Sequence, residues 1–99
     1  RHGQAFTPDG PIHIKNKEFE FDAAPLSEDA PPHVARFSKA FLWHSFRADE
    51  IIAQRVLSFH NLDFFLKLME GAREAIEQDR FREYQSEFNA RYLAKKRAK

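Results

Sequence analysis

The segment LSFHNLDFFLKLM, residues 57–69, contains the strongest structural signal in the sequence. From Leu62 onward its apolar residues recur at intervals of three and four, which places them on one face of a helix. The members of this face are Leu62, Phe65, Leu66, Met69, Ala72 and Ile76. We expect this face to pack in the core. We expect His60 to lie at a junction between two helices, with Ser58 or Asn61 capping the second one.

Helical patterns continue on both sides of this segment. Residues 36–47 place aromatic side chains three and four positions apart, so they are predicted to form a first helix. Asp49 is predicted to cap a second helix, residues 59–77 to form a third, and Asp79 to cap a fourth. The chain from residue 36 onward is therefore predicted to be a run of helices.

Turn signals dominate residues 1–35 instead. The tetrapeptide at 8–11, Pro-Asp-Gly-Pro, predicts a tight turn, because proline fixes one backbone angle and glycine tolerates a positive φ. Residues 12–15 alternate apolar and polar side chains, so we expect a short β-hairpin around the turn. Residues 19–21 alternate again and suggest a short third strand. Residues 22–33 contain three prolines and little periodicity, which predicts an irregular loop.

The sequence therefore predicts an α+β chain that is mostly helical. A β-hairpin and proline-rich loop would occupy residues 1–35 and a helical region residues 36–99, as one structural unit. The length of 99 residues allows one small core, and the net charge of +1 gives no bulk attraction to nucleic acid or anionic lipid. Without cysteine, disulfides and thiolate metal sites are excluded. No apolar run approaches the roughly 20 residues of a membrane span. The absence of cysteine fits a reducing compartment, and we expect a cytoplasmic protein, with a mitochondrial one as the alternative.

Five short motifs follow one another in a recognisable order. They are RHGQAFT at residues 1–7, DGPIHIKN at 9–16, FSKAFLWH at 37–44, ADEII at 48–52 and FHNL at 59–62. In order and spacing, they resemble the C-terminal region of the bacterial-type tRNA-guanine (queuine) transglycosylases, where the matching motifs read RNGQAF, DGxxxIRN, YSRAYLHH, AGEIL and IHNL. No single motif is decisive, but together they make the resemblance specific, and it extends over nearly the whole chain.

This resemblance implies both a fold and a reaction. The family exchanges guanine for a deazaguanine base at the wobble position of tRNA. It does so on a (β/α)8 barrel with a zinc subdomain inserted near the C-terminus. The chain would then correspond to the last part of the barrel with a degenerate zinc subdomain. Base exchange needs a carboxylate nucleophile and a second carboxylate for proton transfer. In the family both lie upstream of the matched region, so we expect no catalytic residue here.

The resemblance also implies roles for single residues. Arg1 matches an arginine that contacts the anticodon stem-loop of tRNA. His60 matches the histidine of the family's zinc site, and the three cysteine positions of that site fall at Asp29, Pro31 and Val34. One imidazole and one carboxylate are too few for a structural zinc ion. His60 is thus the one retained ligand position, and we expect no metal and no cofactor. The loop would be held by apolar packing instead, through Pro25, Leu26 and Val34.

A homodimer contact is implied by three further positions, Phe37, Phe41 and His44. An exposed aromatic patch marks an interface, and the partner would be a second copy or another protein. The alternative is internal packing against Phe64, Phe65 and the last helix. The residues alone favour neither.

Three functions remain open. In the first, the chain completes a tRNA-guanine transglycosylase whose N-terminal barrel portion comes from elsewhere in the polypeptide or from a partner chain, and the chain alone is inactive. In the second, it is a non-catalytic structural or RNA-associated subunit of a larger assembly. In the third, it is a free helical interaction module. Restored guanine exchange would favour the first, and co-purification with an assembly that has no exchange activity the second.

Overall fold

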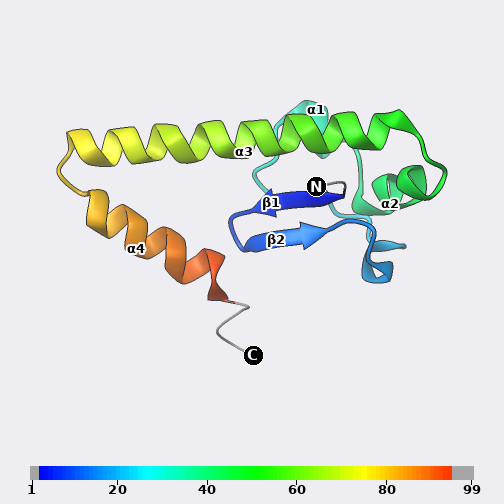
Figure 1. The fold of residues 1–99 in the computed structure, drawn as a ribbon, viewed down its shortest axis with the longest axis horizontal. Helices are drawn as coiled ribbons and strands as arrows, with labels where there is room; N and C mark the ends of the chain where they lie inside the picture. The colour runs from blue at the N-terminus through cyan, green and yellow to red at the C-terminus, as the bar shows by residue number, and fades with distance from the viewer. Residues whose placement is uncertain (1–2, 95–99) are drawn as a thin grey trace.

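The structure, a computed structural model, describes residues 3–94 (Figure 1). Arg1, the expected RNA contact, lies outside the described residues. The elements in chain order are β1 (Gln4–Thr7), β2 (Gly10–His13), the 3-10 helix η1 (Lys17–Phe19), α1 (Pro32–Ala35), α2 (Lys39–Arg47), α3 (Ile51–Glu77) and α4 (Phe81–Tyr92). Helix α3 spans the length of the molecule, the hairpin lies along one half of it, and α4 returns below the other half (Figure 1). The prediction of a mostly helical α+β chain with one hairpin is confirmed.

The predicted hairpin forms around the predicted turn. Strands β1 and β2 are antiparallel, with Gln4 opposite His13 and Thr7 opposite Gly10. Gly10 has φ +110°, a conformation that L side chains rarely adopt, and a Cβ there would lie 2.9 Å from the carbonyl oxygen of Tyr92. Glycine is therefore required at this position for both the turn and the approach of α4.

The predicted third strand over residues 19–21 is wrong. The chain turns away from the sheet instead, because the N–H of Asn16 donates to the carbonyl of His13 and the N–H of Phe19 donates to that of Asn16. The short helix η1 results, and it buries the ring of Phe19 in the core. The alternation of residues 19–21 reflected this single buried ring rather than a half-buried strand.

Helix α3 is one continuous helix of 27 residues, so the predicted junction at His60 is wrong. Ser58 and Asn61 lie inside the helix and cap nothing. No proline interrupts the segment, and its first glycine is Gly71. The polar residues that suggested a break, His60 and Asn61, face strand β1, as their hydrogen bonds to it show. They mark a buried polar contact in the middle of a helix rather than a helix end.

Asp49 and Asp79 do not begin helices, contrary to expectation. Both have φ +57° and follow the last turn of the preceding helix. After α2, the N–H groups of Asp49 and Glu50 donate to the carbonyls of Phe46 and Ser45. The bonds after α3 follow the same pattern. This pair of bonds is the Schellman motif, in which the residue with positive φ closes the helix C-terminus.

Helix α2 starts three residues later than predicted. Its N-cap is Ser38, whose hydroxyl oxygen accepts from the N–H of Phe41 at 3.0 Å and so satisfies a donor that the first turn leaves free. Residues 32–35, assigned mostly to an irregular loop, form the short helix α1, which starts at a proline as helix first turns often do.

One core joins the hairpin, the proline-rich loop and helices η1, α1, α2 and α3, and α4 contributes no residue to it. Its buried members are Ala5, Ile14, Phe19, Leu26, Val34, Leu42, Trp43, Ala53, Val56 and Leu57. Leu26 and Val34 bring the loop into this cluster, as predicted, whereas Pro25 is only half-buried and is not part of it. Within residues 3–94, no helix is both long and apolar enough to cross a membrane.

Helix α4 is attached mainly by aromatic side chains. The rings of Phe88 and Tyr92 contact that of Phe64, and the hydroxyl of Tyr84 donates to the carbonyl of Leu68 at 3.0 Å. A Cβ at Gly71 would lie 2.5 Å from the Tyr84 hydroxyl oxygen, so the Tyr84 ring lies where a side chain at residue 71 would be.

Candidate functional site

His60 lies on the face of α3 that packs against strand β1, and only 3% of its surface is exposed. Its Nε2 atom lies 2.8 Å from the carbonyl oxygen of Phe6. A carbonyl can only accept, so Nε2 must carry the proton and, in the neutral ring, Nδ1 must carry the lone pair. Nδ1 is buried and has no hydrogen-bond partner among the described residues. The imidazole therefore acts as a hydrogen-bond donor to the strand.

Asn61 makes two further bonds to the same strand. Its Oδ1 accepts from the N–H of Phe6 at 3.0 Å, and its Nδ2 donates to the carbonyl of Gln4 at 2.9 Å. Together, His60 and Asn61 satisfy three backbone groups on the edge of β1 that faces away from β2; we call this pair the β1 clamp. Sequence reasoning missed this role of Asn61. The available signal was an adjacent His-Asn pair inside an otherwise apolar helix.

The positions that match the family's zinc cysteines do not fit a metal ion. Asp29 is exposed and accepts from the hydroxyl of Ser27 at 2.6 Å. Pro31 has no ligand atom, and Val34 is fully buried in the apolar core. Nowhere in the described chain do three or more His, Cys, Asp or Glu side chains gather in a way that could hold a metal. A structural zinc site needs about four such ligands.

The predicted interface residues lie at the surface of α2 and just before it. Phe37 is half-buried and stacks on Phe41, with ring centroids 5.3 Å apart. Phe41 is 44% exposed, and the exposed His44 contacts the buried Trp43 edge-on. The ring of Phe64, against which internal packing was the alternative, contacts β1 and α4, while Phe37 packs partly against the core. Phe41 and His44 therefore form an outward-facing aromatic pair.

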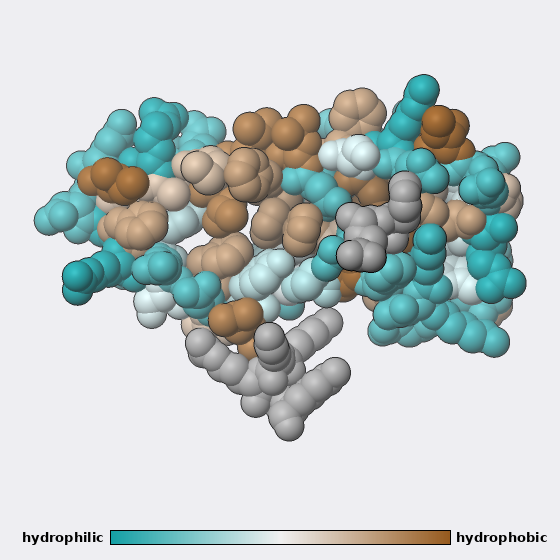
Figure 2. All heavy atoms as spheres, in the orientation of Figure 1, coloured by the Kyte–Doolittle hydropathy of each residue, from teal (hydrophilic) through white to brown (hydrophobic). Residues whose placement is uncertain are grey.

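A row of apolar side chains runs along the outer face of α3. Its members, which we call the α3 stripe, are Leu62, Phe65, Leu66, Met69 and Ile76. Each is 52–62% exposed, so the prediction that they pack in the core of this chain is wrong. Helix α3 also has a second apolar face, opposite the stripe, which contains Ala53, Val56 and Leu57. The hairpin and α2 cover this face. Figure 2 shows hydrophobic residues gathered along the surface above α3.

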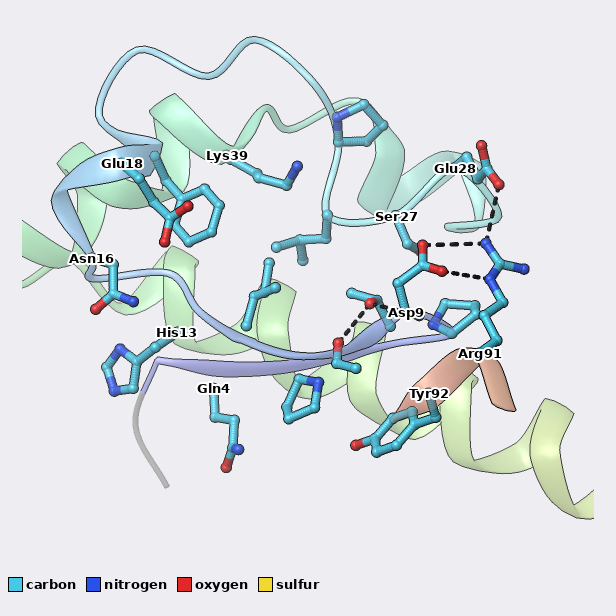
Figure 3. Close-up of a pocket in the computed structure, with 18 of the residues that line it drawn as sticks. Gln4, Asp9, His13, Asn16, Glu18, Ser27, Glu28, Lys39, Arg91 and Tyr92 are labelled. Atoms are coloured by element: carbon cyan, nitrogen blue, oxygen red, sulfur yellow. Dashed lines mark hydrogen bonds and ion pairs between the residues drawn. The ribbon is translucent and has the colours of Figure 1, made fainter. Parts of the chain in front are cut away.

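A cleft of about 910 Å³ lies between the hairpin, the proline-rich loop and the end of α4 (Figure 3). Arg91 closes one end of it, with Nε 2.6 Å from Asp9 Oδ1 and Nη2 3.3 Å from Glu28 Oε1. The hydrogen bond from Arg91 to Asp9 raises the pKa of the guanidinium above its usual value. Lys39 is the other basic residue in the described lining of the cleft, and its ammonium group lies 3.4 Å from the Asp22 carboxylate. Both cations are thus engaged in holding the chain together.

Comparison with known proteins agrees with this arrangement of motifs. A family model described as queuine tRNA-ribosyltransferase matches residues 1–94. The chain belongs to this family. A queuine tRNA-ribosyltransferase from Caulobacter vibrioides is 46% identical over 94 residues, which cover 94% of this chain and 25% of that protein. One from Fusobacterium nucleatum is 41% identical over 96 residues, covering 96% of this chain and 26% of the relative.

A third family member, from Oleidesulfovibrio alaskensis, is 46% identical over 93 residues and is likewise covered to 25%. The chain therefore spans about a quarter of the length of the curated relatives it matches. The family resemblance drawn from the five motifs is confirmed.

Proposed function

We propose that this chain is the C-terminal segment of a tRNA-guanine transglycosylase-like protein, in which it completes an enzyme of the queuosine pathway. The reaction would exchange the guanine at the wobble position of tRNA. The catalytic aspartates would come from the N-terminal barrel portion, supplied by the same polypeptide or by a partner chain. The length of the relatives supports this proposal, because the chain matches only about a quarter of each protein.

The α3 stripe is the observation on which the proposal depends. Monomeric proteins rarely expose a contiguous row of large apolar side chains unless it contacts a partner. Leu66 and Met69 lie one turn apart at its centre, and both are more than half exposed. In a (β/α)8 barrel, each outer helix buries one face against the strands. We propose that α3 is such a helix and that the stripe is the face it buries.

Two further sets of residues have proposed roles in the same assembly. Arg1 would contact tRNA phosphate or base edges through its guanidinium, which can donate two parallel hydrogen bonds. Phe41 and His44, which both face solvent, would form with Phe37 a contact to a second copy of the protein. Residues 1–35 and 36–99 would act as one unit, in the cytoplasm where tRNA is modified.

A chimeric enzyme tests the proposed function. The matched quarter of the Caulobacter vibrioides relative is replaced by this chain, and incorporation of labelled guanine into tRNA is measured. We expect exchange by the chimera and none by the relative truncated before the matched quarter. A chimera that elutes as a folded protein of the expected size but exchanges no guanine would contradict the proposal.

The alternative function is a non-catalytic structural or RNA-associated subunit of a larger assembly. The loss of all three cysteines of the family's zinc site, at the positions of Asp29, Pro31 and Val34, favours it, because a family feature is expected to be lost where selection for catalysis has relaxed. This alternative predicts an inactive chimera. It also predicts that the natural protein co-purifies with an assembly whose other members are not the catalytic part of a transglycosylase.

A further inference from the structure

We infer that this chain attaches its hairpin and proline-rich loop to α3 without a zinc ion, and that the β1 clamp is the polar part of this attachment. The inference depends on contacts inside the described chain and on family membership, and it does not rest on the proposed function. A member of this family would be expected to use His60 as a metal ligand. Here the side chains around it assign it another role.

The free edge of β1 explains why a clamp is needed. Unpaired backbone N–H and C=O groups are costly when they are shielded from water. On one edge β1 pairs with β2, and on the other it runs beside α3 (Figure 1). Asn61 has both a donor and an acceptor, so it satisfies the carbonyl of Gln4 and the N–H of Phe6 at once. These are the groups that a third strand would have paired.

His60 completes the edge by donating from Nε2 to the carbonyl of Phe6. The lone pair left on Nδ1 points to no described partner. A zinc ion at this atom would need further ligands from the proline-rich loop. At the matching positions Pro31 offers no ligand atom and Val34 offers an isopropyl group packed in the core. The retained histidine is therefore a hydrogen-bond donor whose second nitrogen is unused.

Apolar and backbone contacts supply the attachment of the loop. Val34 and Leu26 are buried among side chains from the hairpin and the helices. The ammonium group of Lys67, on α3, donates to the carbonyl of Asp29 at 2.8 Å. The ring of His33 contacts that of Phe59 edge-on, with centroids 6.0 Å apart. Each of these contacts links the loop directly to α3 or to the common core.

The first experiment measures metal content. The 99-residue chain, in the assembly in which it is isolated, is purified from zinc-supplemented cells, and zinc is quantified by mass spectrometry. Thermal unfolding is then compared with and without EDTA. We expect zinc far below one equivalent and an unchanged unfolding midpoint, since a structural zinc site would make folding depend on the metal. One bound zinc per chain whose removal lowers the midpoint would overturn the inference.

The second experiment tests the clamp itself through amide hydrogen exchange at Phe6, whose N–H donates to Asn61. Asn61→Ala should speed this exchange by about tenfold or more, because the N–H loses its acceptor on the helix. Gln54→Ala is the matched control, since Gln54 is an exposed amide two turns earlier in the same helix, and it should leave Phe6 unchanged. Equal exchange rates at Phe6 in the two variants would overturn the role of the clamp.

Discussion

Nε of Arg91, in the last turn of α4, lies 2.6 Å from Oδ1 of Asp9. Asp9 is in the hairpin turn, 82 residues earlier in the chain. The guanidinium of Arg91 also reaches Glu28 in the proline-rich loop. One side chain therefore joins three segments that are distant in the sequence. Because all these groups are exposed, the network should position α4 locally rather than determine the global stability of the fold.

Removal of this cation should loosen the end of α4. In Arg91→Ala, amide exchange in the last turn of α4 should quicken at low salt, while the unfolding midpoint changes little. Salt should produce the same loosening in the wild type, because exposed ion pairs are screened. The matched control is Arg82→Ala, which removes an exposed arginine from the same helix. Equal exchange rates in Arg91→Ala and Arg82→Ala would contradict a role for Arg91 in holding the end of α4.

Replacement of the two aspartates with positive φ should stabilise the protein. Asp49 and Asp79 both adopt φ +57°, which glycine tolerates at a lower cost. Asp49→Gly and Asp79→Gly should each raise the free energy of unfolding by about 0.5–1 kcal/mol, measured by urea denaturation. Glu74→Gly, at an exposed position inside α3, should lower it by about 1 kcal/mol. The same sign for all three variants would refute the assigned backbone conformation.

Gly71→Ala should destabilise the contact between α3 and α4 although alanine is the better helix former. The added Cβ would meet the Tyr84 ring and hydroxyl, at a cost of about 1–3 kcal/mol. In a Tyr84→Ala background, where that ring is gone, Gly71→Ala should instead stabilise by about 1 kcal/mol. A double-mutant cycle on the free energy of unfolding measures this reversal of sign. Additive effects would show that the two residues do not touch.

Acid should weaken the junction between the proline-rich loop and α2. The N–H of Ala24 donates to Oδ1 of Asp22 at 2.9 Å, and this bond, together with the Lys39 ammonium, lowers the pKa of Asp22 below its ordinary 3.8. A carboxyl whose pKa is lower in the folded state stabilises the protein above its unfolded pKa, and that contribution is lost as the pH falls through the folded value. In Asp22→Asn, the fall in stability below pH ~4 should be shallower, by at most about 1 kcal/mol because the group is partly exposed. An unchanged acid profile would contradict this assignment.

The sequence predicted the parts of this fold that local chemistry determines. The turn at Pro8 and Gly10 and the helical runs follow from backbone preferences and periodicity, and the structure has them. The family followed from the order of short motifs. The role of Asn61 did not follow, because a polar residue in an apolar helix can mark either an end or a buried partner. Only the position of β1 decides between these.

The burial of the α3 stripe was the largest error, and its cause is physical. Periodicity shows that Leu62 and Leu66 share a helix face, but it does not show which part of the protein covers that face. In this chain the hairpin covers the opposite face. No described residue covers the stripe, and under the proposed function the catalytic portion of the enzyme would cover it.

Docking of the α3 stripe onto the catalytic portion of a transglycosylase is the central claim. It is tested most directly by the affinity between this chain and the part of the Caulobacter vibrioides relative that the chain does not match, measured by calorimetric titration. We predict binding that Leu66→Glu weakens at least a hundredfold, because a carboxylate would have to be buried in an apolar contact. Glu70→Lys, one turn beyond Leu66 but outside the stripe, should leave the affinity within a few fold. Equal affinities for the wild-type chain and Leu66→Glu, or no binding by either, would contradict the account.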